Sequence, residues 1–159
     1  MLLDIPIPTI RNRSLDCFEV QIASIALWLS SGYELMFANS WSFIFNNIQE
    51  NTLSEIRKQL DKMMPVIIFM DSYWCPWDNN YKSRHSSHAC GVVGLGGNDE
   101  YIICTDAYYQ KKNIDFPLSY FACGIKGFAT IEYTDVTKSD IDYVEILTRS
   151  LEAEGGNLL

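Results

Sequence analysis

Two apolar runs joined by a short turn constrain this chain more than any other feature of its sequence. Residues 88–95, HACGVVGL, and residues 100–109, EYIICTDAYY, flank the tetrapeptide GGND. Apolar runs separated by such a glycine-rich turn are typical of a β-hairpin. Strands with so short a connection can pair only antiparallel, so the sequence predicts an antiparallel sheet around this hairpin.

Helical periodicity is found before and after the predicted hairpin. Asp16 and Glu19 have the D-x-x-E spacing of a capping box, which places the start of the first helix at Cys17. Pro65 follows the second helical segment and is expected to end it. The predicted helices span residues 16–31, 52–64 and 139–154.

Further strands are predicted at residues 66–71, VIIFMD, and 127–134, GFATIEYT. The aromatic-rich segment 33–47 fits either a helix or a strand. Helices come first along the chain and antiparallel strands follow, which predicts the α+β class. A length of 159 residues and a hydrophobic content of 48% predict one domain over residues 1–159.

Composition narrows the function classes. The formal net charge of −8 argues against nucleic acid as the main partner. No apolar run reaches the ~18 residues of a membrane span. Residues 1–10 lack the pattern of a signal peptide, so we expect a cytoplasmic protein with no membrane partner.

The five cysteines contain no C-x-x-C pair, which argues against a disulfide framework and a structural zinc site. His85 and His88 could form a metal pair, but the only soft ligands near them in sequence are Cys75 and Cys90. A closed zinc site needs four well-spaced ligands, so no metal is expected.

One cysteine has a position suited to nucleophilic chemistry. Cys17 is expected at the first turn of a helix, where the helix dipole favours a thiolate, although the charge of Asp16 opposes it. If Leu95 faces Asp99 across the hairpin turn, the antiparallel register places His88 opposite Asp106. Cys17, His88 and Asp106 would then supply a nucleophile, a base and an acid that orients the base.

Plainer interpretations stay open. Free cysteine is among the most buried residue types, so Cys17 could be a core residue. His85 competes with His88 for the role of base, but it lies in the polar loop, where its side chain is less constrained.

The segments DCFEVQIASIALWL, DSYWCPWDNNYKSRHSSHACGVVGL and EYIICTDAYY resemble the N-terminal-domain family of butirosin biosynthesis protein H. The resemblance spans roughly residues 5–135. It implies a papain-like fold similar to that of C39 peptidases. The compact chain is also similar to the stand-alone amide synthase of closthioamide assembly.

The resemblance implies an acyltransferase with Cys17 as nucleophile, His88 as base and Asp106 as orienting acid. Such enzymes take an acyl group from the phosphopantetheine thioester of a carrier protein and pass it to an amine, with no bound cofactor. Papain-like enzymes place an oxyanion-stabilising Gln about six residues before the cysteine. Position 11 is Arg here, so the candidate donors are Asn12, the backbone N–H of Cys17 or an arginine.

Two further groups of residues surround the candidate triad in sequence. The loop of residues 72–84, SYWCPWDNNYKSR, is rich in aromatic residues. This aromatic loop is expected to form a wall of a substrate pocket, although packing would explain its rings equally well. Basic residues flank all three candidate catalytic positions, which suits an acidic carrier protein, although they also commonly populate loops. The candidate substrate-binding residues are Asp71, Tyr73, Trp74, Trp77 and Tyr81, and the candidate docking residues are Arg11, Arg13, Lys82, Arg84, Lys111 and Lys112.

Two other functions fit the same residues. A C39-like cysteine peptidase that cleaves a leader peptide would use the same triad. A papain-like domain without catalytic activity would use the fold for binding alone. Release of a peptide, transfer of an acyl group to an amine, or an unreactive Cys17 would distinguish the three.

Overall fold

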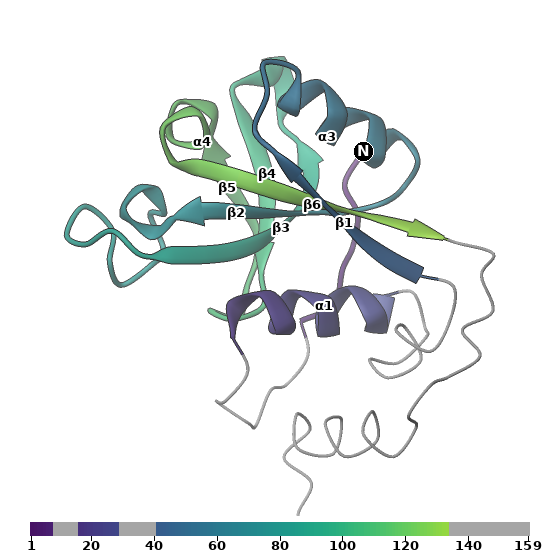
Figure 1. Cartoon of the computed structure of the whole chain (residues 1–159), viewed down its shortest axis with the longest axis horizontal. Helices are drawn as coiled ribbons and strands as arrows, with labels where there is room; N and C mark the ends of the chain where they lie inside the picture. The colour runs from purple at the N-terminus through teal and green to yellow at the C-terminus, as the bar shows by residue number, and fades with distance from the viewer. Residues whose placement is uncertain (8–15, 29–40, 134–159) are drawn as a thin grey trace, which may run out of the picture.

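The sheet of the protein has six strands in the order β1-β6-β2-β3-β4-β5, and every neighbouring pair is antiparallel. The computed structural model of the protein describes residues 1–7, 16–28 and 41–133. Figure 1 shows the strands crossing the centre of the molecule. The strands are β1 Trp41–Asn47, β2 Val66–Asp71, β3 Ser87–Leu95, β4 Tyr101–Asp106, β5 Lys111–Pro117 and β6 Ile125–Tyr133.

Helices lie on both sides of this sheet. In Figure 1, α1 (Cys17–Trp28) runs beneath the strands, whereas α3 (Thr52–Asp61) and α4 (Leu118–Gly124) lie above them. Short 3₁₀ turns, η1 (Ser72–Trp74) and η2 (Gly97–Asp99), follow β2 and β3. This arrangement confirms the predicted α+β class.

The start of α1 has the predicted capping box. The Asp16 carboxylate accepts a hydrogen bond from the Glu19 N–H at 2.8 Å, and Glu19 accepts one from the Asp16 N–H at 3.0 Å. Two N–H groups at the helix start are thereby satisfied, which fixes Cys17 as the first helical residue. Residues 29–31, the end of the predicted helix, lie outside the described residues.

Other predicted elements differ from the structure mainly at their ends. β2 has the predicted bounds, and the strand predicted at 127–134 begins two residues earlier. α3 ends at Asp61, before Pro65, because Met63 adopts a left-handed φ of 62°. Within the ambiguous segment 33–47, residues 41–47 form β1. β5 and α4 were not predicted, and the predicted helix 139–154 lies outside the described residues.

The predicted hairpin forms, but its predicted register is wrong. Leu95 pairs with Ile102, not with Asp99, and a bulge between Val92 and Gly94 shifts the ladder further along β3. The reason is the longer loop of residues 96–100, in which Asn98 adopts a left-handed φ of 62°. Before the bulge, Val92 pairs with Cys104, and continuing this register places Asp106 opposite Cys90.

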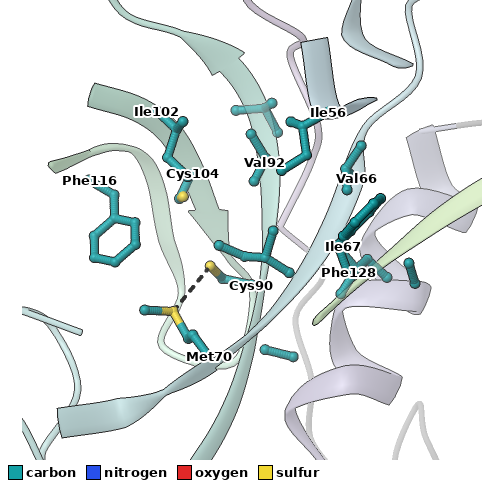
Figure 2. Packing of buried hydrophobic residues seen from close by; sticks show 14 of the residues in the cluster. Ile56, Val66, Ile67, Met70, Cys90, Val92, Ile102, Cys104, Phe116 and Phe128 are labelled. Carbon is teal, nitrogen blue, oxygen red and sulfur yellow. Dashed lines mark hydrogen bonds between the residues drawn. The ribbon is translucent and has the colours of Figure 1, made fainter. Parts of the chain in front are cut away.

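The hydrophobic core lies between the sheet and its helices. Figure 2 shows Ile56 of α3 beside Val66 of β2 and Val92 of β3, with Ile102 of β4 farther across the sheet. All four side chains are fully buried, and each contributes about 1.5–3 kcal/mol to stability. This core holds the sheet ends, where the candidate site lies, in fixed positions.

Three cysteines belong to this core. Cys75, Cys90 and Cys104 are buried free thiols, and the Cys90 sulfur lies 3.9 Å from that of Met70 (Figure 2). A hydrogen bond with Cys104 and burial raise the pKa of Cys90, and burial raises that of Cys75. Thiols in such surroundings are poor nucleophiles.

The described part of the chain contains no helix long and apolar enough to cross a membrane. It also contains no group of three or more side chains arranged to hold a metal ion.

Candidate active site

His88 and Asp106 form a buried hydrogen-bonded pair. Nε2 of His88, near the start of β3, lies 2.6 Å from Oδ2 of Asp106, the last residue of β4. Their exposed fractions are 4% and 0%. They are diagonal neighbours on adjacent strands, a relationship that still lets longer side chains meet.

Four further donors hold the Asp106 carboxylate. The Trp77 indole N–H donates to Oδ2 at 2.6 Å, and the Gln21 amide donates to Oδ1 at 3.2 Å. The backbone N–H groups of Tyr108 and Tyr109 donate to Oδ1 at 3.0 and 3.2 Å. A buried carboxylate is costly unless its oxygens are hydrogen-bonded, and this set of donors meets that need.

Gln21 connects α1 to the two strands that carry the pair. Its amide nitrogen also donates to the Ala89 carbonyl at 3.2 Å, and its oxygen accepts from the Ala107 N–H at 3.3 Å. Gln21 was not among the predicted site residues. The available signal was a polar amide in an otherwise apolar helical segment, because a buried Gln needs hydrogen-bond partners.

Cys17 completes the cluster from the first turn of α1. Burial by itself lowers the pKa of His88, but hydrogen bonds to Asp106 and Cys17, and the charges of both groups, raise it overall to about 9. Since Nε2 is hydrogen-bonded to Asp106, we assign the hydrogen bond with the Cys17 thiol to Nδ1, the other ring nitrogen. Cys17 is half-buried, so its sulfur is not sealed inside the core.

A second carboxylate, Asp78, faces the same histidine. Oδ2 of Asp78 lies 3.8 Å from Nδ1 of His88. The Asp78 carboxylate accepts the Asn80 N–H at 2.7 Å and a hydrogen bond from the Tyr109 hydroxyl. Burial and the charge of Asp78 raise the pKa of Tyr109 to about 12, so Tyr109 stays a protonated donor. Asp78 was not among the predicted site residues.

The other histidine belongs to a separate pair. His85 Nδ1 lies 2.6 Å from Oδ2 of Asp71, and the His85 ring stacks on Tyr73 at 4.5 Å. Burial acts to raise the pKa of Asp71, but the hydrogen bond from His85, the backbone hydrogen bonds from Tyr73 and Ser86 and the charge of His85 together lower it. The His85 side chain is 71% exposed, in contrast to His88.

The aromatic loop divides between two places. Trp77 reaches Asp106, as described above. The Lys82 ammonium nitrogen lies 3.5 Å from the ring centre of Trp74, 5.2 Å from that of Tyr73 and 5.7 Å from that of Tyr81. The ring centre of Tyr120 in α4 lies 5.0 Å from the same nitrogen, so the four rings form an aromatic cage around the Lys82 ammonium group. Among the contacts of the described residues, Trp77 alone of the four predicted aromatics joins the His88–Asp106 pair.

The predicted basic residues have different surroundings. Lys82 lies in the aromatic cage, and Lys112 forms an ion pair of 2.5 Å with Asp4. Arg84 and Lys111 are exposed, and the backbone of Lys111 lies opposite that of Asp106 in the register of β4 and β5. The predicted docking residues Arg11 and Arg13, and the predicted oxyanion donor Asn12, lie outside the described residues.

Neither a search against protein-family models nor a search of curated proteins gives a match to this sequence.

Proposed function

We propose that the protein is a papain-like cysteine acyltransferase that forms amides in the cytoplasm. Cys17 is the nucleophile, His88 the acid–base group and Asp106 the residue that orients His88. The acyl donor is the phosphopantetheine thioester of a carrier protein and the acceptor is an amine. The protein itself needs no bound cofactor, because the acyl group arrives already activated.

One observation carries this proposal. His88 is hydrogen-bonded at once to the buried Asp106 and to the half-buried Cys17, which begins α1. A nucleophile bonded to a base that is itself held by an acid is the arrangement needed for covalent acyl transfer. The donor and acceptor classes rest on the resemblance of DCFEVQIASIALWL and the neighbouring segments to the butirosin family.

In the first half of the reaction, the Cys17 thiolate attacks the thioester carbonyl. The carbon–sulfur bond to phosphopantetheine breaks, and Nδ1 of the His88 imidazolium gives its proton to the departing sulfur. The product is an acyl group on Cys17 and a neutral His88. Backbone N–H groups in the first turn of α1, including that of Cys17, suit the stabilisation of the oxyanion.

Intact-protein mass spectrometry tests the proposal. After incubation with acyl-loaded carrier proteins, we expect the protein to gain the mass of the acyl group, and addition of an amine to remove it as an amide. Cys17→Ala should show no gain, whereas Cys123→Ala should gain mass like the native protein. Cleavage of a peptide substrate without acyl transfer would favour the peptidase alternative.

A further inference from the structure

Two reactive side chains, those of Cys17 and Asp78, face one nitrogen atom of His88. Nδ1 of His88 is the position assigned above to the Cys17 thiol, and Oδ2 of Asp78 lies 3.8 Å from the same nitrogen. That separation is too long for a direct hydrogen bond. A third atom can nevertheless lie within about 3 Å of both Nδ1 and Oδ2, which is hydrogen-bond distance to each.

Asp78 retains capacity to bind such an atom. Its side chain is 3% exposed and accepts two hydrogen bonds, from the Asn80 N–H and the Tyr109 hydroxyl. A carboxylate has about four acceptor positions. A buried carboxylate with acceptor positions left over attracts an N–H donor or a cation more strongly than an exposed one does.

Two aromatic rings lie next to the His88 ring, and one of them, Tyr109, also donates its hydroxyl to Asp78. The ring centres of Tyr109 and Tyr108 lie 5.4 and 6.1 Å from that of His88. Aromatic faces beside a carboxylate are a common setting for binding amines and ammonium groups, because both attract positive charge. Tyr108 is 49% exposed, so this aromatic border reaches the protein surface.

We propose that Asp78, bordered by Tyr108 and Tyr109, forms the acceptor subsite and binds the amine that attacks the acyl group on Cys17. This inference rests on the proposed function and adds to it the residue that selects the amine. Asp78 accepts one N–H of the neutral amine, while the nitrogen lone pair points toward the acyl carbon beside Nδ1 of His88.

The step balances within this arrangement. The amine nitrogen forms a bond to the acyl carbon, and the carbon–sulfur bond to Cys17 breaks, with its electron pair returning to sulfur. Nδ1 of His88 takes one proton from the nitrogen. The products are an amide, the Cys17 thiolate and the His88 imidazolium, which is the state that starts the next cycle.

The charge of Asp78 favours amines over water in this step. As the nitrogen bonds to carbon it becomes positively charged, and a carboxylate already in place stabilises that charge. Attack by water, activated by His88, generates less positive charge on the nucleophile and gains less. Asp78 therefore controls the ratio of amide formation to hydrolysis, and the formation of acyl-Cys17 depends on it far less.

The test separates the two halves of the reaction. Acetyl to octanoyl thioesters of N-acetylcysteamine serve as acyl probes, and propylamine serves as the acceptor. We expect Asp78→Asn to lower the amide-to-acid product ratio at least about tenfold, and to slow the formation of acyl-Cys17 much less. Asp61→Asn, a change at an exposed carboxylate at the end of α3, should leave the ratio unchanged.

Tyr109→Phe is a second variant, which tests the acceptor subsite even if Asp78→Asn does not fold. It removes one hydrogen bond that holds Asp78 and should lower the same ratio severalfold. An unchanged ratio in both folded variants, or an equal loss of acyl-Cys17 formation and amide formation, would overturn the acceptor subsite alone. Failure of the native protein to acylate Cys17 from any donor would instead overturn the proposed function, and the subsite with it.

Discussion

The indole N–H of Trp77 donates a 2.6 Å hydrogen bond to Oδ2 of Asp106. The same oxygen lies 2.6 Å from Nε2 of His88. A residue from the loop after β2 thus fixes the acid that orients the candidate base. The loop is itself closed at its neck, where the Ser72 N–H donates to the Ser86 carbonyl at 2.8 Å.

Replacing Trp77 by Phe should separate this hydrogen bond from packing. The Trp77 ring packs edge-on against Phe116 at 5.5 Å, a contact that Phe can largely keep, but the N–H is lost. A buried hydrogen bond to a charged group is worth about 1.5–3 kcal/mol. We expect urea unfolding to show a loss of stability of that size, and acyl-Cys17 formation to slow about tenfold. Native stability and a native rate of acyl-Cys17 formation would show that the position and function of Asp106 do not require the hydrogen bond from Trp77.

The two cysteines outside the core allow a controlled test of thiol reactivity. Cys17 is half-buried and bonded to His88, whereas Cys123 is exposed. If exposure governed alkylation, iodoacetamide would modify Cys123 first. We expect Cys17 to react at least about tenfold faster, because paired thiolates are the reactive form. Peptide mapping over time measures both rates in one sample.

His88→Gln is the matching variant for this experiment. It should bring the Cys17 rate down to that of Cys123 or below, with the Cys123 rate unchanged. A native protein in which Cys123 reacts faster than Cys17 would contradict an activated Cys17.

The predicted His88–Asp106 pair forms even though the predicted hairpin register is incorrect. The predicted and observed pairings near Val92 differ by two residues, and a shift of two keeps every side chain on the same face of the sheet. A shift of one residue would have turned the two side chains to opposite faces. The pairing therefore changed from directly opposite to diagonal, and the hydrogen bond remained possible.

Other parts of the site and fold carry little local signal. Gln21, Trp77 and Asp78 reach the site from a helix and a loop, and their contacts depend on how these pack against β3 and β4. β5, KKNIDFP, lies at the edge of the sheet, and only Ile114 and Phe116 alternate with polar residues, a run too short to stand out as a strand. α4 has only seven residues and no side-chain cap, which left no start signal to read.

The stability of the protein should depend on the proton of His88. The pKa of His88 is raised to about 9 in the folded protein, from 6.5 for an ordinary histidine. The folded form therefore binds this proton more tightly than the unfolded form does. The resulting stabilisation is fully present below a pH of about 6.5 and is lost as pH rises through about 9.

Urea unfolding between pH 6 and about pH 10 measures this effect. We expect the free energy of unfolding to fall across that range, and His88→Gln to flatten the fall. His85→Gln should keep it, because His85 is exposed and paired with Asp71 instead. The same slope in native protein and His88→Gln would show that other groups cause the pH dependence.

Docking of a carrier protein should depend on basic residues beside the candidate triad. Arg84 and Lys111 are both exposed. Arg84 precedes His88 by four residues, and Lys111 is the residue of β5 opposite Asp106 in the strand register. Such charges act mainly on the rate of encounter with an acidic partner. We expect Arg84→Glu with Lys111→Glu to slow turnover of a carrier-bound thioester about tenfold or more, and to leave turnover of a small soluble thioester nearly unchanged.

A matched variant controls for the change in net charge. It carries the same Lys→Glu change at Lys62, at the end of α3, and at Lys126 of β6, both of which are exposed. Because salt screens charges over ~10 Å at 0.1 M, raising the ionic strength should slow the native protein toward the rate of the variant. Equal losses on the carrier-bound and the soluble thioester would assign the two residues to the fold or the chemistry and not to a partner.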